Sequence, residues 1–311
     1  MFKRPTLSNR LTSSRLAIGG LALASFFTGI GPAAAGQAGT ARQRSLYVSV
    51  VDKDGKPVPD VKPDDLVVRE DGVAREVLRV EPAAEPMQLA LLVDNSASAT
   101  DAIQYLRQSL STFVDTVTAK GHKVSLVTLA NRPTLEVNAT SDAAELRKKG
   151  TNRLFAQPNS GMYLLEAIME TTKGFAKNEA PRPVIVAVVT EGIEFSNQSY
   201  DLVIDALKKA GTSFYALVLT EGGEANPASD EVRNRNVVLD RGARETGGHR
   251  ETLITNMALV GELSKLATEL VNVSKVTYAS PDRLIPAEKI MVEAKRRELT
   301  ARGLPVRASA R

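Results

Sequence analysis

The chain has 311 residues, of which 43% are hydrophobic and 24% are charged, a balance typical of a globular protein with a sizeable core. It contains no cysteine and only two histidines, so thiolate catalysis, cysteine-based zinc sites and multi-histidine metal sites are excluded. The net charge of +4 comes from residues 1–35, which hold four basic and no acidic side chains; the rest of the 40 basic and 36 acidic residues balance. This balance argues against nucleic acid as a partner.

Residues 1–35 have the pattern of a secretory signal peptide. A positively charged start precedes the uncharged apolar stretch 16–30, and Ala33-Ala34-Ala35 supplies the small residues of a cleavage site. The apolar stretch is shorter than the roughly 20 residues that a membrane span needs. We therefore expect an exported protein, periplasmic or secreted, that meets the membrane only if the segment is retained as an anchor. Residues 36–44 are small and polar, which predicts a linker.

Residues 45–82 are predicted to form a small antiparallel β module. Apolar and other side chains alternate from Ser45 onward, as in a strand. Asp54-Gly55 and Asp71-Gly72 are dipeptides of tight hairpin turns. The segment 81–86, rich in proline and alanine, marks the end of this module.

Residues 87–273 alternate between apolar runs and segments of helical periodicity, which predicts a doubly wound α/β domain with a mostly parallel sheet. The predicted strands are 88–93, 123–129, 183–190 and 213–219. The predicted helices start near 103 and cover 162–175, 200–210, 238–246 and 259–271. The tail 274–311 alternates again, which predicts a β hairpin of 289–295 and 304–308 that can pair with the N-terminal module.

Oxygen-bearing side chains follow two of the predicted strands. Asp94-Asn95-Ser96-Ala97-Ser98 comes after the first, and Thr190-Glu191-Gly192 ends the third. Ligands of an open parallel sheet bind beyond the carboxyl ends of its strands, at the point where the strand order reverses. Carboxylate and hydroxyl oxygens are ligands for hard cations such as Mg²⁺, Mn²⁺ or Ca²⁺.

The pattern Asp94-x-Ser96-x-Ser98 after an apolar strand resembles the metal-ion-dependent adhesion site of von Willebrand factor type A domains. The preceding module is similar to that of the bacterial proteins described as von Willebrand factor type A-related, in the stretches 52–58, 64–66 and 70–72. The resemblance covers most of 45–308 and implies a Rossmann-like sheet. It also implies that Asp94, Ser96, Ser98 and Glu191 hold Mg²⁺, or Mn²⁺ or Ca²⁺, and that an acidic side chain of a protein partner completes the metal shell.

Two positions depart from the family pattern. Met162 stands where the family has a threonine in the second metal loop, with Asn159 or Ser160 as substitutes if the loop shifts. Glu191 replaces the usual aspartate of the third loop. Two alternatives therefore stay open: a scaffold with a degenerate, metal-free site, and a serine-rich turn in which Ser98 or Thr100 caps the following helix.

A hydrolase is the remaining alternative, with Ser96 or Ser98 as the nucleophile. Such an enzyme needs a base within hydrogen-bond reach. His122 precedes the predicted strand 123–129, and His249 follows the helix stop Gly247-Gly248 and enters the last predicted strand, so both belong at the opposite edge of the sheet from the serines. We therefore predict a non-enzymatic binding protein.

Overall fold

The computed structural model describes residues 42–220, 229–282, 285 and 287–305, and these belong to one compact unit formed by residues 39–311. The predicted signal peptide, residues 36–41 of the predicted linker and residues 306–308 of the predicted hairpin lie outside the described residues. Among the described helices, none is both long enough and apolar enough to cross a membrane.

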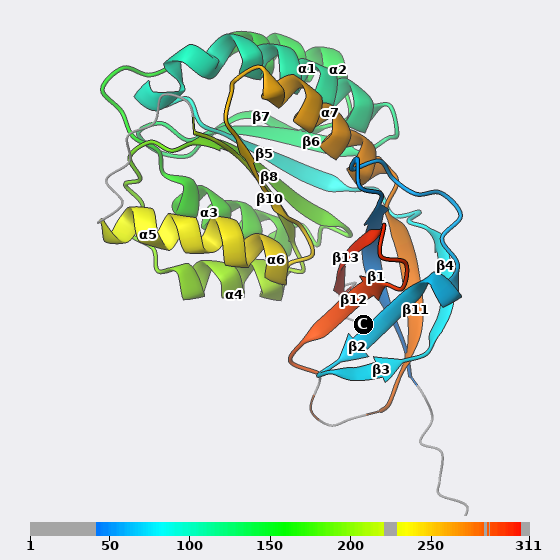
Figure 1. The fold of residues 1–311 in the computed structure, drawn as a ribbon. Coiled ribbons are helices and arrows are strands. Elements are labelled where there is room, and N and C mark those ends of the chain that lie inside the picture. The colour runs from blue at the N-terminus through cyan, green and yellow to red at the C-terminus, as the bar shows by residue number, and fades with distance from the viewer. Residues whose placement is uncertain (1–41, 221–228, 283–284, 286, 306–311) are drawn as a thin grey trace, which may run out of the picture. The chain divides into compact units, whose positions relative to one another are not determined.

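Two antiparallel sheets form the β module, which contains both ends of the described chain (Figure 1). The first sheet has the order β13-β1-β11-β4, with β1 Arg42–Val51, β4 Val77–Pro82, β11 Ser274–Ser280 and β13 Thr300–Pro305. The second has the order β12-β2-β3, with β2 Leu66–Glu70, β3 Val73–Arg75 and β12 Ile290–Ala294, and the 3₁₀ turn η1 Pro63–Asp65 precedes β2. Apolar side chains of both sheets, among them Val48, Val68, Val276 and Val292, share one core.

The ends of this module differ from the sequence-based prediction. The first strand begins at Arg42, so that the last three residues of the predicted linker are paired with β11. The two C-terminal strands do not form a hairpin with each other: β12 pairs with β2, and β13 pairs with β1. The separate pairings place Val292 and Leu304 where each becomes buried.

The second part of the unit is the predicted doubly wound domain, and its mostly parallel sheet confirms the fold class. The strand order is β10-β9-β8-β5-β6-β7, with β5 Gln88–Val93, β6 Lys123–Thr128, β7 Thr134–Thr140, β8 Pro183–Thr190, β9 Ser213–Leu219 and β10 Arg250–Leu253. Only β7 runs antiparallel. It was not predicted, because only Val137 of its seven residues is buried and no clear alternation results.

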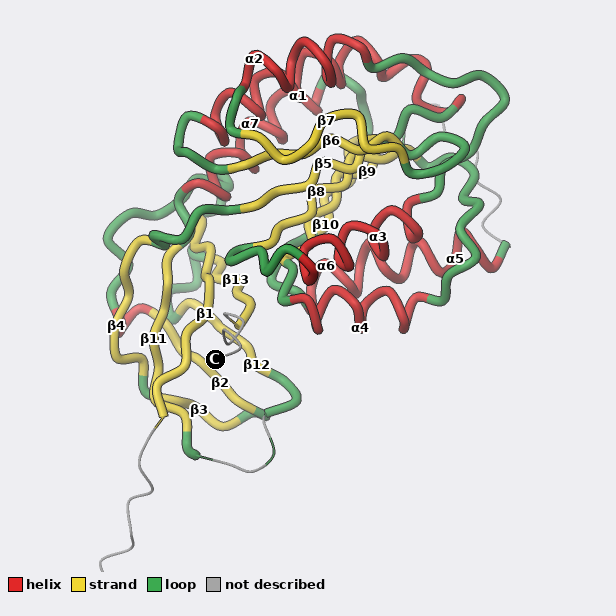
Figure 2. The backbone as a smooth tube through the Cα atoms, turned by 180° about the vertical axis from the view of Figure 1, so that it is seen from behind, coloured by secondary structure: helices red, strands yellow, loops and turns green. Residues whose placement is uncertain are grey.

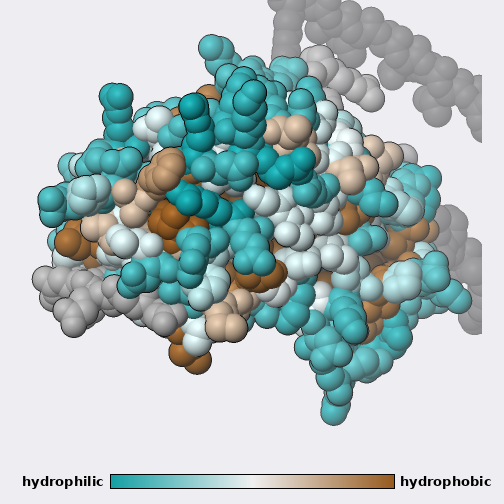
Figure 3. Space-filling model, turned by 90° about the horizontal axis from the view of Figure 1, so that it is seen from above, coloured by the Kyte–Doolittle hydropathy of each residue, from teal (hydrophilic) through white to brown (hydrophobic). Residues whose placement is uncertain are grey.

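Helices cover both faces of this sheet (Figures 1 and 2). One face carries α1 Ile103–Thr118 and α7 Ala258–Val271; the other carries α3 Leu164–Lys177, α4 Tyr200–Ala210, α5 Asp230–Val237 and α6 Ala243–Glu245. Shorter turns are η2 Ala97–Ala102, α2 Ala143–Glu145, η3 Leu146–Gly150, η4 Thr151–Arg153 and η5 Val238–Gly242. Leu91 packs toward α1 and α7, and Leu92 packs toward α3 and α4, as expected of a strand buried on both faces. The outer surface over α1 and α7 is mostly hydrophilic, with apolar side chains in small separate groups (Figure 3).

The helix predicted at 238–246 begins earlier, at Asp230. The Ser229 side chain caps it by accepting a hydrogen bond from the Val232 amide. The segment is so polar that its helical periodicity is weak, and Val232 and Arg235 are its two buried residues. This early start brings Arg235 into the interior.

Candidate metal site

The candidate site lies where β5 ends between its two parallel neighbours, β6 and β8. Successive strands are added on opposite sides of β5, so this is the point at which the strand order reverses and where such sheets bind ligands. Asp94 follows β5, and its amide donates to the Val188 carbonyl of β8 at 2.9 Å. The Asp94 loop and the Thr190 loop are therefore adjacent, as the sequence predicted.

Asp94 is fully buried, and its carboxylate is fixed by three donors. Its Oδ1 accepts from the Ser96 amide at 2.8 Å. Its Oδ2 accepts from the Thr190 amide at 3.2 Å and from the Thr190 hydroxyl at 2.5 Å. Two carboxylate oxygens offer about four acceptor positions, so one remains open after these three bonds.

The two serines of the loop, Ser96 and Ser98, follow this carboxylate closely in the chain. Ser96 is fully buried, and its Oγ has no hydrogen-bond partner among the described residues. Ser98 is half-buried, and its side chain faces Gly192: a Cβ added there would collide with the Ser98 hydroxyl and lie 2.8 Å from the Ser98 Cβ. An orphaned buried hydroxyl is costly, and a cation would satisfy its oxygen lone pairs. The residues thus fit a small hard cation at Asp94, Ser96 and Ser98.

Neither Ser98 nor Thr100 caps a helix, so that alternative is wrong. No side-chain hydrogen bond caps η2 or α1. The Thr100 hydroxyl donates to the Ala97 carbonyl at 2.7 Å instead of accepting from a helix amide.

The second loop contacts the first through its backbone. The Ala97 amide donates to the Ser160 carbonyl at 3.3 Å. The Ser160 hydroxyl donates to the Gln157 carbonyl at 2.6 Å, and Asn159 is exposed with a left-handed φ of 54°. Within the described parts of the chain, neither side chain hydrogen-bonds to Asp94, Ser96 or Ser98.

Met162, in the family's threonine position, points into the apolar core. Its backbone pairs with the third loop, because its amide donates to Ile193 and its carbonyl accepts from Phe195, each at 2.9 Å. The third loop therefore stays attached to the second without a metal-ligating side chain at position 162. Glu191, half-buried, is tied to β9 by its amide, which donates to the Leu219 carbonyl at 3.0 Å.

Glu194 is a buried carboxylate that the sequence reasoning missed. Its Oε1 accepts from the Leu164 and Ser196 amides, each at 3.1 Å, which ties the third loop to the start of α3. Its Oε2 has no partner among the described residues. Burial raises the pKa of Glu194 to about 7, against the opposing effect of its hydrogen bonds and of Arg235. The signal in the sequence was its place two residues after Gly192.

Arg235 is the second missed residue. Its side chain is only 1% exposed, and its Nη1 donates to the Gly192 carbonyl at 2.5 Å. Burial lowers the pKa of Arg235, and the charges of Glu194, Asp94 and Glu191 raise it. A guanidinium stays protonated in proteins, so this is a permanent cation beside the candidate site. Its position three residues after the buried Val232 was the available signal.

The histidines lie at the opposite edge of the sheet. His122 precedes β6, where its Nδ1 accepts from the Met87 amide at 3.1 Å. His249 precedes β10, and its carbonyl accepts from the Ala216 amide. Neither is near the serines, as the sequence predicted. In the described ranges, no three His, Cys, Asp or Glu side chains group as a metal site, so the candidate site depends on its hydroxyls.

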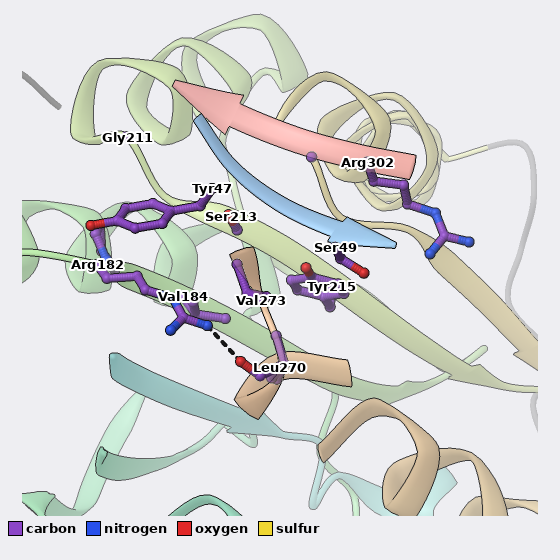
Figure 4. Close-up of a pocket in the computed structure, with 12 residues that line it drawn as sticks. Tyr47, Ser49, Arg182, Val184, Gly211, Ser213, Tyr215, Leu270, Val273 and Arg302 are labelled. Carbon is purple, nitrogen blue, oxygen red and sulfur yellow. Dashed lines mark hydrogen bonds between the residues drawn. The ribbon is translucent and has the colours of Figure 1, made fainter. Parts of the chain in front are cut away.

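Two cavities lie away from this site, where the β module meets the domain. One, of about 20 Å³, is lined by Tyr47, Arg182 and Tyr215 among others, and there Arg182 Nη2 donates to the Leu270 carbonyl at 2.5 Å (Figure 4). It has room for about one water molecule. The other, of about 330 Å³, lies between the 52–55 turn and α7. Neither contains the Asp94 loop.

Residues 89–193 match the family model of the von Willebrand factor type A domain, and the domain therefore belongs to that class. A search of curated proteins gave no match. Among solved structures, a von Willebrand factor type A protein from Catenulispora acidiphila has a TM-score of 0.50 and 13% identity, over 88% of this chain and 67% of that one. Proximal thread matrix protein 1 from the mussel byssus gives 0.48 and 14%, over 70% of this chain and 51% of that one. BatB from Bacteroides thetaiotaomicron gives 0.42 and 17%, over 60% and 98%. At these identities the likeness concerns the fold alone.

Proposed function

We propose that the protein is an exported, non-enzymatic binding module whose partial metal-ion-dependent adhesion site engages an acidic side chain of a protein partner. The observation that carries this proposal is the buried Ser96 hydroxyl, which has no partner among the described residues and belongs to a residue whose amide donates to the fixed Asp94 carboxylate. A buried hydroxyl oxygen without a hydrogen-bond partner needs an explanation, and coordination of a cation through its lone pairs would provide one.

The residues that would hold the ion are Asp94, Ser96 and Ser98, with Glu191 as a further carboxylate. Their hard oxygens suit Mg²⁺, and Mn²⁺ or Ca²⁺ as alternatives. With one fixed carboxylate and two neutral hydroxyls, the protein neutralises only part of the charge of a divalent ion. An acidic group from a partner would therefore gain from joining the shell.

Exposed apolar side chains favour a protein as the partner. Phe155, Ile193 and Phe195 are each at least half exposed and belong to the second and third loops. The Phe195 ring lies over Gly161, where an added Cβ would be 2.6 Å from the ring. Apolar side chains gathered on loops beside a polar site are typical of interaction surfaces. Export is supported by the signal-like sequence of 1–35.

A metal-free scaffold is the second candidate, and two observations favour it. Met162 contributes no oxygen, and Arg235 already places a positive charge next to the carboxylates. In this case the surface of the second and third loops would bind a partner without an ion.

The test compares thermal stability and partner capture in Mg²⁺ or Mn²⁺ with those in chelator, for the wild type, Asp94→Ala and the matched control Asp101→Ala. Asp101 is exposed in the same loop region, so its loss should change neither property. An ion that binds only the folded state raises the melting temperature by mass action. We expect a rise in the wild type and in Asp101→Ala, and none in Asp94→Ala. No metal response in the wild type, with partner capture retained in chelator, would favour the scaffold.

A further inference from the structure

We propose that Arg235 is a built-in cation of the candidate site, which holds the third loop in place without metal and weakens the binding of a divalent ion. This inference rests on the proposed function, because it concerns the same site. It assigns a role to a residue outside the Asp-Ser-Ser pattern.

The geometry ties Arg235 to the third loop. Its Nη1 donates to the Gly192 carbonyl at 2.5 Å, and Gly192 is the residue against which the Ser98 side chain packs. Among the described residues, the other guanidinium nitrogens, Nε and Nη2, donate to Asn236 Oδ1 at the longer distance of 3.4 Å. At 1% exposure the side chain is out of reach of a partner, so it acts on the site through its charge and its hydrogen bond to Gly192.

The charges around Arg235 are those of the site. Glu194 acts on it most strongly, then Asp94 and Glu191, while Arg250 opposes them. A buried arginine without carboxylate neighbours would be very costly, so the carboxylates make its burial tolerable. Conversely, the guanidinium offsets part of the negative charge that would otherwise attract a divalent ion.

A divalent ion at Asp94 would share these carboxylates with Arg235 and be repelled by it. Between charges in a poorly solvated interior this repulsion is only weakly screened. We therefore expect removal of the arginine charge to tighten divalent-ion binding by at least about tenfold. The same removal should loosen the third loop in the absence of metal.

The experiment measures Mn²⁺ affinity by titration calorimetry and the melting temperature in chelator, on the folded chain. The variants are Arg235→Met, which removes the charge with similar volume, and Arg235→Lys, which keeps it. The matched control is Arg233→Met, an exposed arginine of the same helix. If Arg235→Met does not fold, Glu194→Gln/Arg235→Met is compared with Glu194→Gln, since removing both of two buried opposite charges is better tolerated than removing one.

Arg235→Met is expected to bind Mn²⁺ at least about tenfold more tightly than the wild type and to melt at a lower temperature in chelator. Arg235→Lys and Arg233→Met should stay within about threefold of the wild-type affinity, because each leaves the buried charge in place. Tighter binding in Arg235→Met when the wild type binds no Mn²⁺ would support the inference and contradict metal dependence of the wild type. Equal or weaker binding in Arg235→Met than in the wild type would overturn the inference and leave the metal site standing. Absence of binding in every variant would overturn both.

Discussion

The Ser96 hydroxyl has no hydrogen-bond partner among the described residues, which leads to a testable prediction. The sign of the stability change in Ser96→Ala distinguishes a metal ligand from a buried serine with a structural hydrogen bond. A buried polar group without a partner costs about 1–3 kcal/mol, so Ser96→Ala should remove that cost when no metal is present. Taking the lower end, we expect the free energy of unfolding in chelator to rise by about 1 kcal/mol. For a chain of this size that corresponds to an increase in melting temperature of about 2–4 °C.

Calorimetry in chelator and in excess Mg²⁺ measures both parts of this prediction. Ser96→Ala should melt higher than the wild type in chelator and lose most of the metal-induced rise. Ser49→Ala is the matched control: Ser49 is also buried, but its Oγ donates to Glu269 Oε1 at 2.5 Å. Loss of a hydrogen bond to a charged group should cost about 1.5–3 kcal/mol. If Ser96→Ala destabilised the protein in chelator as Ser49→Ala does, the hydroxyl would have a structural partner and the reasoning would be refuted.

Three further predictions concern the loops and the β module. Gly192→Ala should cost about 1–3 kcal/mol in a denaturant titration and abolish the metal response, because the new Cβ collides with the Ser98 side chain; unchanged stability would contradict this packing. Because the pKa of Glu194 is raised to about 7 from 4.5 in the unfolded chain, its contribution to stability is present below pH 4.5 and is lost as the pH rises toward 7. This loss is on the order of 3 kcal/mol, and Glu194→Gln should flatten it in melts across that range. Glu70→Ala should cost about 3–5 kcal/mol in chemical denaturation, because this buried carboxylate accepts from Tyr278, Ser280 and Arg75; a loss below 1 kcal/mol would contradict a central role for this network.

Local sequence patterns were sufficient to predict the strands that are buried on both faces. Strands such as β8 are continuous apolar runs, and their bounds agree with the prediction to the residue. The missed elements carry few buried positions: β7 has one, and α5 has two, one of which is an arginine. Strand partners were also beyond local patterns, because β12 and β13 bury their apolar residues against strands more than 200 positions earlier in the chain.

The residues of the candidate site also fall into those that local sequence patterns predicted and those that they missed. The Asp94 loop was predictable because its residues are contiguous and follow a recognisable strand. Glu194 and Arg235 were not, because their meaning depends on burial. A glutamate and an arginine 41 positions apart look like solvent-exposed residues until the fold brings both into the interior beside Gly192. Sequence patterns assign charged residues to the surface by default, so buried charged residues are what they detect least well.

The absence of a second-loop ligand at Met162 and the presence of the buried Arg235 can be explained together. With Met162 in the core, the second loop supplies no side-chain oxygen from that position, yet backbone pairing still joins it to the third loop. In the proposal above, the guanidinium of Arg235 supplies a positive charge at the candidate site, where a bound cation would otherwise supply it. On this proposal the loops are ordered at any metal concentration. A bound ion is then not needed to order the loops and serves to contact the partner. Partner capture should therefore follow the metal concentration as a single-site saturation curve, while the metal-induced rise in wild-type melting temperature is modest, because a weakly bound ion contributes only RT ln(1 + [L]/Kd) to folding.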